Sequence, residues 1–197
     1  MKSATLAIAA LTLTAAVPAL AQTQVQSGTY KVEPAHTQVL FGVSHLGFTT
    51  YYGVFSGASG SLTLDSANPA ASKLDVSVPT ASVWTPSDKL NEELKGPQWL
   101  DAAKYPAMTF HSTAVTPTGA TTADVAGELT LHGVTKPVTL KVKFNSAGPN
   151  PLTKAYTTGF QVSGVVKRSD FGVSMYVPMV GDDVDLTISA AFEKAGG

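Results

Sequence analysis

Four histidines, His36, His45, His111 and His132, are the side chains best suited to acid–base or metal chemistry in this chain. The sequence contains no Cys, so thiol catalysis and Cys-based metal sites are excluded. The spacing of the histidines matches no local zinc motif, and a metal centre would need them to converge from separate strands. We therefore expect hydrogen-bonded, half-buried histidines, and no metal or cofactor.

Motifs that carry a nucleophile or bind a phosphate are also missing. There is no Gly-x-Ser-x-Gly, His-Glu-x-x-His, Gly-Lys-Ser/Thr phosphate loop or Gly-x-Gly-x-x-Gly. The small residues Gly57–Gly60 are interpreted as a bend in a strand. A Ser, His and Asp triad assembled from distant positions stays open. The alternative function is therefore an exported hydrolase or isomerase, with a histidine as general base next to Asp170 or Glu33.

Arg168 is the only arginine in the sequence and begins the polar cluster Arg168-Ser-Asp-Phe-Gly172. A guanidinium forms paired hydrogen bonds with phosphate or carboxylate, so beside a cavity it would suit an anionic or quinone head group. An ordinary ion pair with Asp170 or Asp182 that fixes a loop is the structural alternative. The sequence leaves both roles open.

The elements that must position these residues are strands. Leu129 and Leu131 alternate with Glu128 and Thr130, and Val138, Leu140, Val142 and Phe144 share one face of the next stretch. Such a period of two predicts a sheet with one buried and one solvated face, as in an antiparallel meander. A turn is expected over 132–136, with Pro137 opening the following strand. Strands are predicted at 28–33, 37–46, 51–65, 72–82, 107–116, 122–131, 137–146, 154–167 and 182–194.

One segment, near 87–104, interrupts the strand pattern. Ser87 is a candidate N-cap, Leu90 and Leu94 lie four residues apart, and Gly96 would end a helix of two turns. We expect this segment to cross one end of a barrel. Its apolar residues would either plug the core or form a lid over the cavity: Leu90, Leu94, Trp99 and Leu100.

Several motifs, in the same order, resemble the YceI-like family of exported lipid-binding proteins. They are Tyr30–Thr37, Phe41–Phe48, Gly53–Phe55, Lys104–Phe110, Gly127–Leu140, Arg168–Gly172 and Val180–Val184. The resemblance implies an all-β, lipocalin-like up-and-down barrel of about eight strands that holds an isoprenoid chain, either a polyprenyl phosphate or a quinone tail, without catalysis. Glu33 and Thr37 depart from the Asp and Ser usual in the family.

The resemblance also decides how the interior is interpreted, because alternation alone fits a filled core and an open cavity equally well. Phe48 and Phe144 are available as interior aromatic residues. The residues expected to line the cavity are Phe41, Val43, Phe55, Met108, Phe110, Leu129, Leu131, Phe160, Val162, Phe171 and Met175. A polar mouth is expected to contain His36, His45, Arg168 and Asp170.

The first 21 residues have the pattern of a cleaved secretory signal peptide. Lys2 precedes the apolar run 6–17, and Ala19-Leu-Ala21 provides a cleavage site. Residues 22–197 would then form one domain in the periplasm or outside the cell. The formal net charge is −1, with no basic patch for nucleic acid. We expect an isoprenoid lipid as the ligand, transient membrane contact, and a monomer or homodimer.

Overall fold

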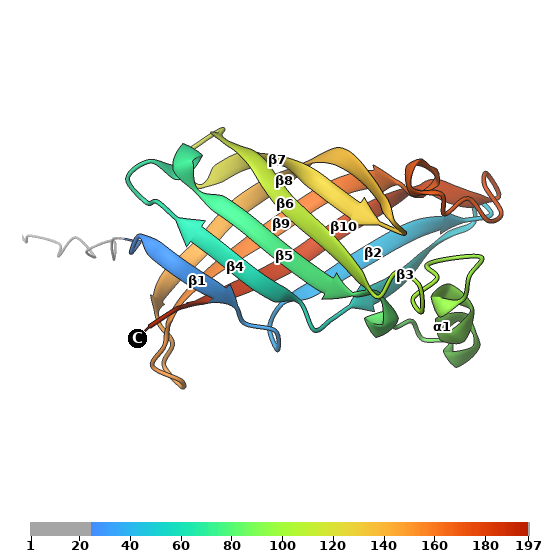
Figure 1. Ribbon diagram of the computed structural model, residues 1–197, viewed down its shortest axis with the longest axis horizontal. Helices are drawn as coiled ribbons and strands as arrows, with labels where there is room; N and C mark the ends of the chain where they lie inside the picture. The colour runs from blue at the N-terminus through green and yellow to red at the C-terminus, as the bar shows by residue number, and fades with distance from the viewer. Residues whose placement is uncertain (1–24, 197) are drawn as a thin grey trace, which may run out of the picture.

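The computed structural model describes residues 25–196, which form a closed antiparallel barrel (Figure 1). The expected signal peptide lies outside the described residues. The strands are β1 (Gly28–Val32), β2 (Gln38–His45), β3 (Thr49–Phe55), β4 (Ser59–Leu64), β5 (Lys73–Pro79), β6 (Ala107–Pro117), β7 (Thr122–Leu131), β8 (Val134–Pro149), β9 (Tyr156–Lys167) and β10 (Val180–Lys194). Short 3-10 helices occupy Pro69–Ala71, Thr80–Ser82 and Arg168–Phe171.

The ten strands fill eight positions around the barrel. β1 and β2 follow each other along one edge of β10, and β3 and β4 pair with β2 and β1 respectively. From β4 the sheet continues through β5, β6, β7, β8 and β9 back to β10, each strand antiparallel to the next. Neighbours in space are thus neighbours in sequence, which confirms the predicted all-β, up-and-down barrel.

Two neighbouring positions of the barrel are interrupted at the same level. β1 and β2 are separated by residues 33–37, and β3 and β4 by residues 56–58. The sequence predicted one strand over 51–65 with a bend at the glycines, and the bend is present. Gly60 has a φ of +131°, and a Cβ there would lie 2.1 Å from the carbonyl oxygen of Asp75. Only glycine fits this close approach between β4 and β5.

The β7–β8 hairpin differs from the predicted turn over 132–136. Its loop contains only His132 and Gly133, both with positive φ (52° and 76°), as in a two-residue type I′ turn. β8 therefore begins at Val134, and Pro137 lies inside the strand. The proline is tolerated because β8 pairs with β9 only from Lys141 onward. No partner strand needs the missing N–H at that position.

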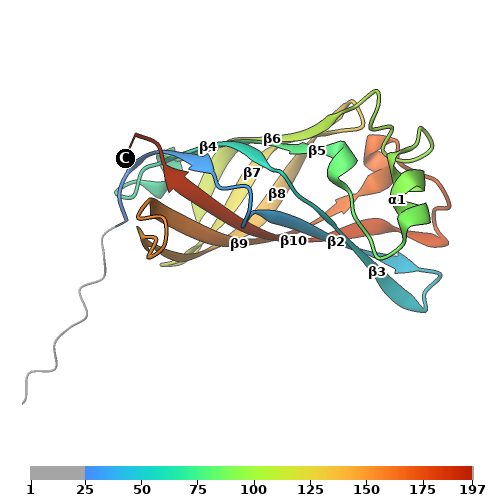
Figure 2. The same cartoon turned by 90° about the horizontal axis from the view of Figure 1, so that it is seen from below.

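Helix α1 (Asp88–Lys95) lies within the connection from β5 to β6, as predicted. The Ser87 side chain caps it by accepting a hydrogen bond from the Leu90 N–H at 3.3 Å, and residues 97–104 form turns. The connection crosses one end of the barrel (Figure 2). It is anchored to the free edge of β3, where Val54 and Trp84 exchange two backbone hydrogen bonds of 2.9 Å.

The opposite end of the barrel is closed by side chains. Tyr30, Leu62 and Phe192 are buried there, and Phe160 packs against them. The Phe160 ring makes edge-on contacts with Phe192 and Phe144, with centroids 6.0 and 5.8 Å apart. The barrel is thus a tube filled at one end and crossed by α1 at the other. Among residues 25–196, no helix has the length and apolarity needed to cross a bilayer.

Candidate ligand-binding cavity

The barrel encloses a cavity of about 700 Å³. This volume lies within the range of sites that bury most of a drug-sized ligand. The interior is therefore open, which resolves the choice that strand alternation left undecided. Its walls are almost entirely aliphatic and aromatic, contributed by alternate residues of the strands.

Eight of the eleven residues expected on the cavity wall do line it. They come from β2, β3, β6, β7 and β9, where the period of two puts them on the inner face: Phe41, Val43, Phe55, Met108, Phe110, Leu129, Leu131 and Val162. Sequence reasoning missed further lining residues on strands whose apolar face it had recognised, such as Leu140 on β8 and Leu186 on β10. The alternation that defined those strands was the signal that could have identified them.

Phe160, Phe171 and Met175 do not line the cavity, in contrast to the expectation. Phe160 points inward but belongs to the aromatic plug at the closed end. Phe171 is buried against Leu131 and Val166 of the cavity wall without lining the cavity, and Met175 is half-buried in the connection between β9 and β10. Composition identifies such residues as apolar but not the level of the tube at which they lie.

All four residues of the predicted lid, Leu90, Leu94, Trp99 and Leu100, border the cavity. A buried network holds their segment in place. The side-chain oxygen of Asn91 accepts hydrogen bonds from the N–H (2.6 Å) and hydroxyl (2.9 Å) of Thr85, and its amide donates to the Thr85 carbonyl (3.1 Å). This connection is therefore a defined element of the wall.

Arg168 lines the same end of the cavity and is only 5% exposed. Its guanidinium donates three hydrogen bonds to backbone carbonyls, those of Gly181 (2.8 Å), Val173 (2.9 Å) and Val180 (2.8 Å). It also lies over the Trp99 ring, 5.5 Å from the centroid. Burial lowers the pKa of this guanidinium, although the nearby charge of Asp182 opposes the shift.

The ion pair of Arg168 with Asp170 or Asp182, which was the structural alternative, is not formed within residues 25–196. Asp182 instead accepts hydrogen bonds from the N–H (2.9 Å) and hydroxyl (2.8 Å) of Ser169. These bonds, that of the N–H first, lower the pKa of the Asp182 carboxyl. Asp170 is exposed to solvent and does not line the cavity. Arg168 is thus a buried cation satisfied by carbonyl dipoles.

The two histidines expected at the mouth are separated. His45, at the end of β2, lines the cavity next to the Tyr51 ring. His36 lies in the β1–β2 interruption, 80% exposed, where its Nδ1 is 2.5 Å from the Glu33 carboxylate. Although desolvation acts in the opposite direction, the hydrogen bonds from His36 and two backbone N–H groups lower the pKa of Glu33.

This placement bears on the catalytic alternative. That alternative needs a histidine next to Asp170 or Glu33, and the structure forms the pair His36–Glu33. This pair lies outside the cavity, so it does not face an enclosed substrate. His45 has no hydrogen bond to a carboxylate within the described part of the chain. Nor do residues 25–196 contain a group of three or more potential metal ligands.

The polar residues of the cavity gather at the end crossed by α1. They include His45 and Thr49 at the β2–β3 turn, Glu93 on α1, Arg168 after β9, and Tyr176 before β10. The rest of the tube, down to the closed end formed by Tyr30, Leu62 and Phe192, is apolar apart from Thr37, whose hydroxyl donates a hydrogen bond to the Ala191 carbonyl at 3.2 Å. This arrangement suits an amphiphile whose tail lies in the barrel and whose polar end stays at the mouth.

Comparison with known proteins matches residues 30–192 to the YceI-like domain. A UPF0312 protein of Pseudomonas syringae pv. tomato is 38% identical over 188 residues, covering 95% of this chain and 97% of the relative. Among solved structures, Burkholderia cenocepacia BcnA superposes with a TM-score of 0.73 and 26% identity, covering 81% of this chain and 98% of BcnA. A polyisoprenoid-binding domain from Saccharophagus degradans has the same fold at 15% identity, with a TM-score of 0.65 and coverage of 86% and 99%.

Proposed function

Because this chain belongs to the YceI-like family, we propose that its barrel binds one isoprenoid chain, with the tail in the tube and the head group at the mouth. The observation that carries this proposal is the cavity of about 700 Å³, which is apolar along most of its length and has its charged lining residues, Glu93 and Arg168, at one end. The polyisoprenoid-binding domain with the same fold supports this class of ligand. From the signal-peptide pattern of residues 1–21, we place the activity in the periplasm or outside the cell, in lipid carriage, storage or stress protection.

The apolar wall accounts for affinity without specific polar contacts. Each buried methylene contributes about 0.8 kcal/mol, so a tail that fills the tube binds tightly through desolvation alone. A tube closed by Tyr30, Leu62 and Phe192 also limits how long that tail can be. The protein would therefore discriminate among ligands mainly by the length and width of the tail.

Arg168 favours an anionic head group over a neutral one. A guanidinium has five N–H donors, and three of them serve the carbonyls of Val173, Val180 and Gly181. Within residues 25–196, no carboxylate lies within ion-pair distance of this buried cation. A phosphate at the mouth would supply the missing negative charge, so a polyprenyl phosphate fits better than a quinone.

Native mass spectrometry of the gently purified protein tests this function. We expect an apolar ligand to co-purify, and the Leu140→Asn variant to lose it, because Leu140 lines the cavity. Thr139→Asn is the matched control, since Thr139 is exposed on the outer face of the same strand. A ligand-free protein that takes up neither a polyprenyl phosphate nor a quinone would overturn the proposal. Turnover of a generic ester by that protein would favour the hydrolase instead.

A further inference from the structure

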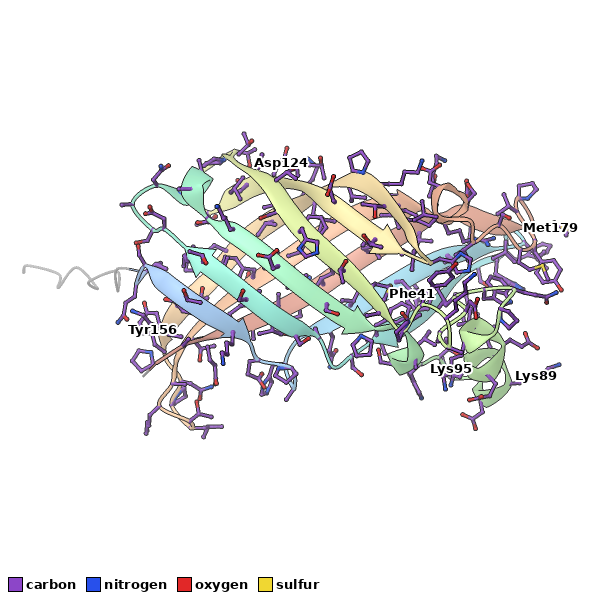
Figure 3. The ribbon with its side chains drawn as sticks, viewed as in Figure 1. Phe41, Lys89, Lys95, Asp124, Tyr156 and Met179 are labelled. Carbon is purple, nitrogen blue, oxygen red and sulfur yellow. The ribbon has the colours of Figure 1, made fainter. Side chains whose placement is uncertain are left out.

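Four large apolar side chains lie along one side of the mouth of the cavity and are exposed to solvent. Leu46 and Phe48 lie at the β2–β3 turn, and Tyr176 and Met179 lie in the connection before β10. The two loops touch, because the Leu46 N–H donates a hydrogen bond to the Met179 carbonyl at 2.9 Å. Figure 3 shows Met179 at the end that carries α1, with Tyr156 at the opposite end. We call these four residues the apolar rim.

Two residues of the rim have an unfavourable backbone conformation in addition to their exposed apolar side chains. Leu46 and Tyr176 have φ values of 55° and 59°, in the left-handed region where Gly or Asn is easily accommodated and a bulky side chain is not. The exposed Leu46 gains little from packing to offset this strain. A strained backbone at an exposed residue that gains little stability from packing points to a role in function.

The two loops that carry the rim contain no formally charged residue. No Asp, Glu, Lys or Arg occurs from residue 34 to residue 64, or from 171 to 181. The two loops can therefore leave water without desolvating an ion. Because these two loops contain no Lys or Arg, the rim itself offers no basic side chain to a strongly anionic surface. An uncharged apolar edge matches a zwitterionic lipid surface.

The rim is continuous with the cavity. Tyr176 belongs to both, and Thr49, next to Phe48, lines the cavity as well. The Trp99 ring lies 6.2 Å from that of Tyr176. Aromatic rings with one polar edge are enriched at the level of lipid head groups.

We propose that the apolar rim inserts into the interfacial layer of a zwitterionic bilayer and seats the cavity mouth on the membrane. An apolar chain then passes between bilayer and barrel without crossing water. The transfer step rests on the proposed function, whereas the insertion step rests on the rim alone.

Flotation with phosphatidylcholine vesicles tests the insertion step. The protein is used in its exported form, with loss of the expected signal peptide checked by mass, because that apolar run would itself bind lipid. We expect the wild type to float with the vesicles and Phe48→Ser to bind roughly tenfold more weakly, since Phe48 is 86% exposed and would be buried only on insertion. Leu46→Asn should also weaken binding without unfolding, because Asn tolerates the left-handed backbone.

Leu152→Ser is the matched control. Leu152 is 89% exposed in the β8–β9 connection, at the end away from the rim, so its loss should leave flotation unchanged. Equal weakening by Phe48→Ser and Leu152→Ser would overturn the proposal. The proposal would also be overturned if the wild type bound vesicles only when anionic phosphatidylglycerol is added, or if it bound no vesicles.

A second measurement separates this proposal from the proposed function. Phe48→Ser should keep its co-purified ligand in solution but take up polyprenyl phosphate from vesicles more slowly than the wild type. If the wild type retains its ligand but does not bind vesicles, the proposed membrane insertion is wrong and the proposed lipid-binding function is unaffected. If the protein binds vesicles but holds no ligand, the insertion step is supported and the proposed function is wrong.

Discussion

At the scale of single residues, Arg168 links the fold to the candidate site. It holds the carbonyls of Val173, Val180 and Gly181, which flank the loop that carries half of the apolar rim. The sequence identified this residue as unusual but did not identify its partners. They are backbone carbonyls 5 to 13 residues away, and every residue has a carbonyl whatever its side chain. Its two proposed roles, in positioning the loop and in meeting the head group, can be separated experimentally.

Arg168→Gln removes the positive charge and the guanidinium group that donates the three hydrogen bonds. We expect the free energy of unfolding to fall by about 3 kcal/mol, because hydrogen bonds to charged groups contribute about 1.5–3 kcal/mol each and some carbonyls will find water. Binding of a polyprenyl phosphate should weaken more than binding of a quinone with the same tail. Denaturant titration and ligand titration measure the two effects. Lys167→Gln is the control for charge, because Lys167 is exposed and its ion pair among residues 25–196 is with Asp183.

Equal weakening of both ligands by Arg168→Gln would assign the residue to the loop alone. The head group would then be selected elsewhere at the mouth.

At the scale of elements, the connection containing α1 is the part of the wall most able to open. It is held by the internal Asn91–Thr85 network and by the two backbone hydrogen bonds between Val54 and Trp84, and not by a continuous strand ladder. Asn91→Ala should therefore free this segment, with a loss of about 1–3 kcal/mol from the unpaired Thr85 groups. We expect faster amide exchange over residues 85–100 and faster release of the bound chain. Glu92→Ala, an exposed position on the same helix, should change neither.

Faster amide exchange with an unchanged release rate would show that the ligand passes elsewhere. The matching interruptions at 33–37 and 56–58 would then be the next part of the wall to test.

Most of the elements could be predicted from the sequence because each strand has one buried face. Alternation located the strands and capping located α1, and both signals are local. The errors share a cause: the level at which a residue lies along the tube depends on the whole barrel and not on its neighbours in sequence. Phe48 was available as an interior residue but is exposed at the mouth, whereas Phe160 lies in the plug. His36 was expected at the mouth but lies in the β1–β2 interruption.

At the scale of the whole molecule, the barrel is a tube with one closed end, and its depth should set the length of the chain it accepts. Ala190 on β10 lines the cavity and packs against the plug residues. Its small side chain leaves the last part of the tube open. A larger residue there would occupy space that the end of a tail would otherwise fill.

Ala190→Leu should therefore have opposite effects on the empty and the loaded protein. The added methyl groups fill part of the cavity, so the ligand-free barrel should melt at a slightly higher temperature. The longest chains should bind roughly tenfold more weakly, because their ends lose buried methylenes, while short chains are unaffected. Ser189 points outward from the same strand, so Ser189→Leu should alter neither the melting temperature nor the binding of long chains. If long and short chains weakened equally, the tail would not reach Ala190, and the closed end of the barrel would not determine chain length.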